Sequence, residues 1–144
     1  PITPVKYWNG DGFTSPTPKP DCITSTFGSL RSYNGSDFIY FHAGIDFCGN
    51  DKTQIFAAAD GVVVFAGPLT VRGNATIIDH GQGLYTGYWH QSKQLVQAGD
   101  HVRAGQVIGM VGATGRVTGP HLHFEVFVNG VQVDPTDWLR SQNP

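Results

Sequence analysis

The chain of 144 residues has no long apolar segment and no cluster of basic residues. Its longest apolar runs, such as residues 55–59 and 62–66, are far shorter than the ~20 residues that a membrane-spanning helix needs. The nine lysines and arginines stand singly and the net charge is −2, whereas nucleic acids and anionic membranes bind to basic patches. We therefore expect no nucleic-acid and no membrane partner, and one ordinary domain that is a monomer by default.

Glutamate is nearly absent, because Glu125 is the only one in the chain. A zinc protease of the His-Glu-x-x-His kind needs a glutamate between its two histidines, so this class is excluded by inspection. Six histidines and ten aspartates are present. Any metal or acid-base chemistry must therefore come from groups of these two residue types.

Cysteine is also scarce, since the chain holds only Cys22 and Cys48. A disulfide between them would stabilise the fold by roughly 3.5 kcal/mol in the chain-entropy model. It would also indicate an oxidising compartment, so that the protein is secreted or otherwise extracytoplasmic. Two alternatives stay open, because spacing does not prove pairing. The two residues could be reduced thiols of a cytosolic protein, or Cys48 could be a zinc ligand two residues beyond Asp46 on the same strand face.

Helical periodicity is absent from the sequence as well. Short runs of Val, Ile, Phe and Tyr alternate instead with glycine, and the 19 glycines indicate many tight turns. The predicted fold class is therefore all-β and mainly antiparallel. Helical turns are expected only at residues 135–140 and 24–30.

Five prolines lie in residues 1–20 and disfavour both helix and central strand there. We expect this part to be an extended segment, docked through Trp8 and Phe13 on a single domain of residues 21–144. Because Pro1 is not a translational start and no signal-like region follows it, we also expect a longer precursor from which any export signal has been removed.

The first candidate site lies in residues 41–47, where polar and apolar residues alternate. On a strand this alternation puts His42, Gly44 and Asp46 on one face. The bare glycine between the two polar side chains would leave room for an ion. By itself the pattern also fits a hydrogen-bonded structural pair.

The second candidate site lies in residues 119–127, where alternation puts His121, His123 and Glu125 on one face of a strand and apolar residues on the other. Two adjacent buried imidazoles are costly without a partner. The pattern therefore favours a shared metal or a catalytic pair over two satisfied core histidines.

Together the two segments offer His42, Asp46 and one of the paired histidines as metal ligands. Three ligands leave the fourth tetrahedral position of zinc open, which is typical of catalytic sites. Glu125 is expected to support a ligand or to pair strands rather than to bind the metal. His80 and His101 are expected to be histidines of surface loops.

Residues 96–109 resemble the turn-and-strand segment of biotinyl and lipoyl carrier domains. Carrier domains attach their cofactor to a lysine on a tight hairpin, usually next to methionine, but here Met110 is followed by Val111. A carrier function is therefore disfavoured. What remains is the expectation of a β-hairpin in a compact sandwich.

Several elements, in this order, resemble the zinc metallopeptidases related to lysostaphin and LytM, known as the M23 family. They are the His-x-Gly-x-Asp motif of residues 42–46, the Tyr-x-His of residues 88–90, and residues 112–126 with their His-Leu-His. The resemblance covers roughly residues 25–138. It implies the compact two-sheet β-sandwich of the lysostaphin-type peptidases.

The resemblance also implies roles for single residues. His42, Asp46 and His123 would bind one zinc ion, while His121 and His90 would be the catalytic pair beside the reacting water. Zinc lowers the pKa of water and polarises a carbonyl, so an imidazole can take the proton. We expect His121 to be this base and His90 to orient water or stabilise the oxyanion, with an exchange of the two roles left open.

Members of the family mostly cut peptides of bacterial peptidoglycan, so the resemblance implies a zinc-dependent endopeptidase acting on cross-bridge or stem peptides. Tyr33, Tyr40, Tyr85 and Tyr88 are candidates to line the substrate groove, with plain packing as the alternative. The alternative function is a non-catalytic LytM-like regulator of other cell-wall hydrolases. The intact ligand set disfavours it.

Two features depart from the family's usual pattern. Gln91 follows His90 where leucine is usual, and the cysteine pair is not a general family feature. Neither departure removes a catalytic group. The sequence does not encode which bond is cut, whether between glycines or beside D-alanine or diaminopimelate.

Overall fold

The computed structural model describes residues 13–28, 30–32, 39–114 and 119–139, with side chains left out at 30–32 and 39–41. Its strands, in chain order, are β1 (Ile23–Ser25), β2 (Leu30–Ser32), β3 (Ile39–Phe41), β4 (Ile45–Cys48), β5 (Gln54–Phe56), β6 (Gly61–Leu69), β7 (Gly73–Gly81), β8 (Leu84–Gln94), β9 (His101–Val102), β10 (Val107–Val111), β11 (His121–Val128) and β12 (Val131–Val133). A short 3-10 helix, η2 (Pro135–Asp137), follows. None of the helical structure in these ranges is long and apolar enough to span a membrane.

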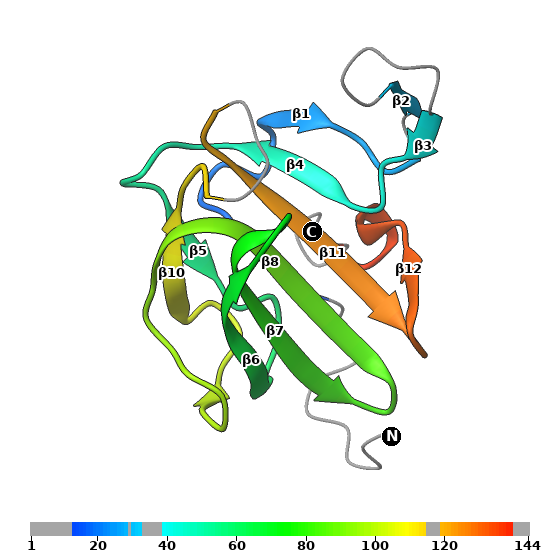
Figure 1. Cartoon of the computed structure of the whole chain (residues 1–144). Helices are drawn as coiled ribbons and strands as arrows, with labels where there is room; N and C mark the ends of the chain where they lie inside the picture. Colours follow the sequence, from blue (N-terminus) through cyan, green and yellow to red (C-terminus); the bar gives the residue numbers. More distant parts are fainter. Residues whose placement is uncertain (1–12, 29, 33–38, 115–118, 140–144) are drawn as a thin grey trace.

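The pairings between these strands are all antiparallel, which confirms the predicted all-β class. The main sheet runs in the order β1-β4-β11-β8-β7-β6-β9, and β2 pairs with β3 apart from it (Figure 1). Strand β8 belongs to two layers. Its first residues pair with β11, whereas its last residues pair with β10, which also pairs with β5. One core therefore fills the space inside a strongly bent sheet.

Strand β11 shows how the alternation of the sequence builds that core. Leu122, Phe124 and Val126 are fully buried and face the core, as predicted, so the residues between them face the other side of the strand. Strand β4 does the same with Ile45 and Phe47, each 1% exposed. The polar residues of both strands are thus presented together on the opposite face.

The beginning of the described chain is closely docked. Phe13 is fully buried, as predicted, and its backbone N–H donates to the Trp138 carbonyl. Trp8 lies outside the described residues, and the division of the chain at residue 20 stays a prediction. The helical turn expected at residues 24–30 is wrong, because β1 pairs with β4 there, whereas η2 provides the helical turn expected at residues 135–140.

The hairpin expected in residues 96–109 is also wrong. Strand β9 pairs with β6, while β10 pairs with β5 and β8. The two strands of this segment therefore go to different partners, although each is a short strand next to a tight turn. A local sequence pattern found the strands but not their neighbours.

His80 is not a surface-loop residue, contrary to the expectation, because it is fully buried in β7. Its Nδ1–H donates to the Asp60 carbonyl at 2.8 Å, and its Nε2 accepts from Thr86 Oγ1 at 2.8 Å. The following turn is only two residues long, Gln82 and Gly83, both with positive φ, so β7 continues past His80. His101 is exposed, as predicted, but it belongs to strand β9 and not to a loop.

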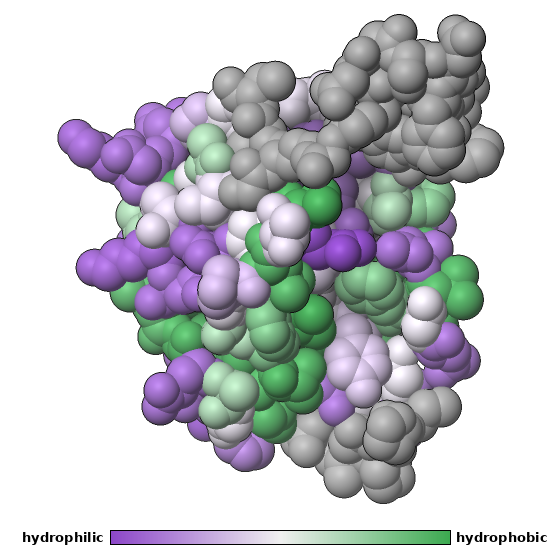
Figure 2. All heavy atoms as spheres, in the orientation of Figure 1, coloured by the Kyte–Doolittle hydropathy of each residue, from purple (hydrophilic) through white to green (hydrophobic). Residues whose placement is uncertain are grey.

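Figure 2 shows a band of hydrophobic residues over the face where Figure 1 places β6, β7 and β8. Among the described residues, the large exposed apolar side chains within these strands or next to them in sequence are Val64, Leu69, Val71 and Leu95. Val64 and Leu69 belong to β6, not to the strands β4 and β11 that carry the buried polar cluster described next.

Candidate metal centre and active site

Three potential metal ligands from two distant parts of the chain meet at a buried point. His42 Nε2 lies 3.1 Å from Asp46 Oδ1 and 3.1 Å from His123 Nδ1, and the last two atoms are 2.7 Å apart. All three side chains are at most 9% exposed. Strand pairing creates the meeting, because His123 of β11 lies directly opposite Asp46 of β4. These three residues, the ligands predicted from the sequence, form a group that could hold a metal ion.

His42 reaches this point from the link between β3 and β4 rather than from a strand. Gly44 in the same link does not serve the purpose proposed from the sequence. A Cβ built on it would lie 2.3 Å from the Phe124 carbonyl oxygen and 2.9 Å from Glu125 Cγ. The glycine therefore makes room for β11, not for an ion, and this close approach brings His42 onto His123.

Outer hydrogen bonds fix the tautomers of both histidines. The Nδ1–H of His42 donates to the Thr26 carbonyl at 2.9 Å, which leaves the Nε2 lone pair facing the cluster. The Nε2–H of His123 donates to Glu125 Oε2 at 2.6 Å, which leaves Nδ1 facing the cluster. Partners of this kind orient metal-binding imidazoles in many proteins. The predicted supporting role of Glu125 agrees with this geometry.

The donor set fits a zinc ion. Catalytic zinc takes three nitrogen or oxygen ligands from the protein, and ligand atoms at its usual bond lengths are about 3.3 Å apart in tetrahedral geometry. The three observed separations, between 2.7 and 3.1 Å, need only a slight expansion to match. Without a cation or an additional proton, the lone pairs of two imidazoles would face each other across 3.1 Å.

The charges around His123 favour a cation as well. Burial acts to raise the pKa of Asp46, but without a metal ion its hydrogen bonds with His123 and His42, which need a proton on a facing ring nitrogen, outweigh burial and hold this pKa below its usual range. Burial acts likewise on Glu125, whose pKa is nevertheless lowered by its hydrogen bond with His123. For His123, burial lowers the pKa, but the two carboxylates outweigh it and raise the pKa. Two ionised carboxylates therefore flank one imidazole.

Trp89 packs against the cluster and was not found from the sequence. Its ring stacks on His123 with centroids 6.5 Å apart and planes 18° apart, and Arg72 lies over the indole. The indole fits there because residue 87 is a glycine. A Cβ at that position would lie only 2.5 Å from the indole. The Thr26 carbonyl was missed for another reason, since a backbone acceptor leaves no signature in a sequence.

His90 faces the cluster because β8 contains a bulge. Between the pairs Asn74–Gln91 and Thr76–Tyr88, β8 has two residues opposite one on β7. A bulge breaks the alternation, and His90 takes φ of 64°. The centroids of the His90 and His121 imidazole rings are consequently 5.0 Å apart.

Both imidazoles of this pair are anchored in the same way. The Nδ1–H of His90 donates to the Thr114 carbonyl at 2.7 Å, and the Nδ1–H of His121 donates to the Gly119 carbonyl at 3.1 Å. The Nε2 of His121 lies 3.8 Å from Asp46 Oδ1. Burial lowers the pKa of His90 to about 4, so this imidazole is neutral at ordinary pH.

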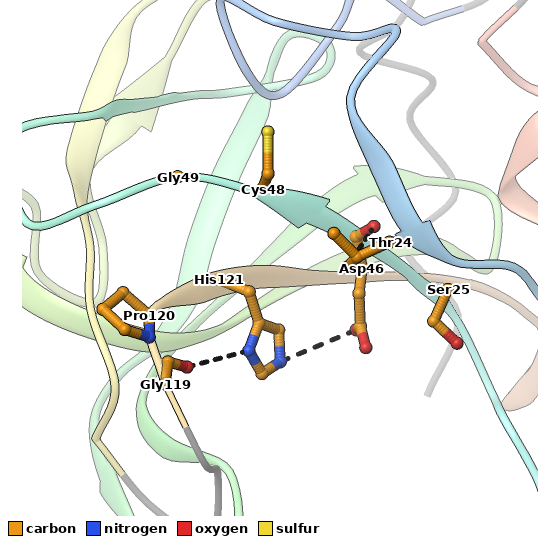
Figure 3. A pocket seen from close by; sticks show the side chains of 8 residues that line it. All are labelled: Thr24, Ser25, Asp46, Cys48, Gly49, Gly119, Pro120 and His121. Carbon is orange, nitrogen blue, oxygen red and sulfur yellow. Dashed lines mark hydrogen bonds and ion pairs between the residues drawn. The ribbon is translucent and has the colours of Figure 1, made fainter.

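A pocket of about 370 Å³ opens beside His121, as Figure 3 shows. Asp46 and His121 are on its wall, and the side chain of Cys48 points away from both. Cys48 forms a disulfide with Cys22. The predicted disulfide is therefore confirmed, and both alternatives, reduced thiols and a thiolate ligand to zinc, are wrong.

The tyrosines proposed for the groove have separate outcomes. Tyr88 is fully buried in the core, where its hydroxyl accepts from the Ala58 N–H at 3.0 Å, so its proposed groove role is wrong. Tyr85 is half-buried. The side chains of Tyr33 and Tyr40 lie outside the described part of the chain.

The chain is similar to known peptidases in sequence and in structure. The model of "Peptidase family M23" matches residues 40–135. The peptidoglycan DD-endopeptidase ShyC of Vibrio cholerae is 41% identical over 113 residues, which are 78% of this chain and 26% of that protein. A zinc-containing peptidase from Vibrio cholerae has a TM-score of 0.74 at 32% identity, over 94% of this chain and 39% of that one. The catalytic domain of lysostaphin from Staphylococcus simulans has a TM-score of 0.72 at 35% identity, over 81% and 90%.

The family match includes every residue of the cluster described above, from His42 to His123. The chain spans about a quarter of the length of the curated relatives that it matches. Because the family model covers well over half of the chain, the protein is a member of peptidase family M23.

Proposed function

We propose that the protein is a zinc-dependent endopeptidase that hydrolyses peptide bonds of bacterial peptidoglycan outside the cytoplasm. ShyC, which is similar over 78% of the chain, is a peptidoglycan DD-endopeptidase. The Cys22–Cys48 disulfide supports an oxidising compartment. The substrate, the location and a monomeric state are proposals for this chain.

One observation carries the proposal. Two imidazoles and a carboxylate bring three lone-pair atoms within 3.1 Å of one another, and the outward N–H of each imidazole is already bound. His42, Asp46 and His123 would hold the zinc ion. When bound, zinc polarises a carbonyl group and lowers the pKa of water, which is the chemistry that peptide hydrolysis requires.

His121 would take the proton of the attacking water at Nε2. Its Nδ1–H is engaged by the Gly119 carbonyl, so Nε2 carries the free lone pair, and the side chain is 22% exposed at the pocket. A base has to be neutral and within reach of substrate. The partial exposure of His121 meets the second condition better than the buried His90 does.

His90 would orient the reacting groups. Its ring is held by the Thr114 carbonyl and by the backbone of the β8 bulge, and its low pKa keeps it neutral. With its Nδ1–H bound to the Thr114 carbonyl, the neutral imidazole can accept a hydrogen bond from water at Nε2. To donate one to a developing oxyanion, Nε2 would need a second proton, which the low pKa disfavours. The rigid anchoring favours such a fixed electrostatic role over proton shuttling.

The experiment is digestion of purified peptidoglycan, with mass spectrometry of the released fragments. Wild type, zinc-stripped protein, His121→Ala and the control His101→Ala are compared on pentaglycine-bridged and on directly cross-linked material. We expect fragments from wild type and His101→Ala alone, and recovery of the stripped protein on addition of zinc but not of iron(II), which the same donor set binds in oxygenases. A non-catalytic regulator would release no fragments with any of the four proteins.

A further inference from the structure

The disulfide closes a loop of the chain that contains two of the proposed zinc ligands. Cys22 and Cys48 are 26 residues apart in sequence, and His42 and Asp46 lie between them. Asp46 is two residues from Cys48 on β4. The disulfide therefore links the residue directly before β1 to β4, the strand that carries the proposed ligand Asp46.

Strand β1 is a short edge strand with little apolar surface to dock it. It is three residues long, lies at the edge of the sheet and, within the described chain, pairs with β4 alone. Cys22, Ile23 and Thr24 are all exposed, so hydrophobic burial contributes little to its docking. Its contacts with β4 include the backbone bond from the Cys48 N–H to the Cys22 carbonyl and a weak bond from Thr24 Oγ1 to the Asp46 carbonyl.

The residues directly after β1 form two hydrogen bonds with His42. The Thr26 carbonyl accepts the Nδ1–H of the His42 ring at 2.9 Å, and the Gly28 N–H donates to the His42 carbonyl at 2.8 Å. Ser25 Oγ also lies 3.3 Å from His42 Nδ1. These contacts fix both the backbone and the ring orientation of a residue that no strand contains.

We propose that the Cys22–Cys48 disulfide is a positioning element of the metal site. By holding β1 on β4 it keeps the Thr26 carbonyl against His42 Nδ1, and so keeps His42 Nε2 directed at Asp46 and His123. The inference rests on the proposed zinc site but not on the identity of the substrate. It gives the disulfide a role in metal affinity, beyond its contribution to the stability of the fold.

The test is the zinc dissociation constant, measured by chelator competition, of wild type and of the double variant Cys22→Ser/Cys48→Ser. Loss of an outer partner of a metal ligand weakens binding roughly 10- to 100-fold, and we expect a weakening on the order of tenfold here. All titrations contain sucrose, which is excluded from protein surfaces and keeps a weakened fold compact. Circular dichroism verifies that each protein is folded.

The matched control is Ile55→Ala, a truncation of a fully buried residue on β5, which pairs with β10 and not with β1, β4 or β11. It lowers stability from a strand that does not pair with β1, β4 or β11, so its zinc affinity should equal that of wild type. In the metal-free proteins, NMR should show the His42 Nδ1 proton exchanging faster with water in the double variant than in Ile55→Ala.

The outcomes separate this inference from the proposed function. Equal zinc affinity of wild type and the double variant would overturn the inference and leave the zinc site standing. Equal weakening in Ile55→Ala would also overturn it, because the effect would then reflect stability alone. Failure of wild type to bind zinc would overturn both proposals.

Discussion

Two histidines of this protein are buried in neighbouring parts of one sheet, yet their surroundings differ in kind. His80 of β7 is fully buried and His123 of β11 is 9% exposed. His80 is surrounded by a backbone carbonyl and a hydroxyl, whereas His123 lies between the carboxylates of Asp46 and Glu125. Burial lowers the pKa of His80 to about 4, while the pKa of His123 is raised against its burial. The partners, not the burial, distinguish a structural histidine from a candidate ligand.

The environment of His80 is a complete chain of neutral hydrogen bonds. The Ala58 N–H donates to the Tyr88 hydroxyl, which donates to Thr86 Oγ1, which donates to His80 Nε2, and His80 Nδ1–H donates to the Asp60 carbonyl. Both ring nitrogens of His80 are engaged, so neither is left for an ion. The cluster at His123 has the opposite property, because three lone-pair atoms converge on one point.

The largest expected effect comes from removing the ligand. His123→Ala should lower zinc affinity by more than the roughly 100-fold that loss of an outer partner costs, and peptidase activity should fall with it. His80→Gln should keep one zinc per chain. Elemental analysis after gel filtration in a weak chelator measures both. Zinc retained by His123→Ala, or lost by His80→Gln, would erase the contrast between the two histidines.

A large effect on catalysis alone is expected from His121→Ala. Removing a general base typically lowers kcat 10²- to 10⁴-fold, and the three ligand atoms do not include this side chain. Zinc content and KM should therefore stay close to those of wild type. Steady-state kinetics combined with zinc analysis decides the point, and a fall in zinc content would make His121 a ligand instead of a base.

An effect of about 3 kcal/mol is expected at His80 on acidification. The pKa of His80 is about 4 in the folded state and near 6.5 in the unfolded state. The unfolded chain therefore binds more protons between these two pH values. The stabilisation is complete above pH 6.5 and is lost as the pH falls toward 4, at about 1.4 kcal/mol per unit. Protonated His80 would also have to donate from Nε2 to Thr86 Oγ1, which reverses the direction of the hydrogen bonds that run through Thr86.

Urea denaturation of the zinc-free protein at several pH values measures this loss. In the matched variant His80→Gln the slope of the unfolding free energy between pH 6.5 and 4 should be shallower than in wild type. Identical slopes would show that His80 is not the group that titrates.

The smallest effect is expected from Glu125→Gln. The amide oxygen can still accept the Nε2–H of His123, but the negative charge beside the imidazole is lost. Zinc affinity should weaken about tenfold, the lower end of the range for outer partners. Chelator competition gives the value, and Glu125→Ala should weaken binding further because no acceptor remains. Equal zinc affinities of the Glu125→Gln and Glu125→Ala variants would show that charge alone matters.

The sequence predicted what strict alternation determines. On β11 a period of two fixes which residues face the core, and it places His121, His123 and Glu125 together without any knowledge of the fold. The all-β class followed from the absence of helical periodicity. The division of roles between His121 and His123 came from a family resemblance, since alternation treats the two alike.

What the sequence did not predict depends on contacts between distant residues. Gly44 is explained only by the approach of β11, and the burial of His80 only by its contacts with Asp60 and Thr86. The orientation of His90 depends on a bulge, which inserts one residue into an otherwise regular strand and has no fixed sequence signature. Such features arise from strand pairing and not from local propensity.

The most direct test of the account is the position of zinc in crystals of the zinc-loaded protein, from anomalous scattering measured on both sides of the zinc absorption edge. We predict one peak per chain, within bonding distance of His42 Nε2, Asp46 Oδ1 and His123 Nδ1, with His121 and His90 beside it but not bound. A peak ligated by His90 or His121 in place of one of these three, or no peak at the cluster, would contradict the account.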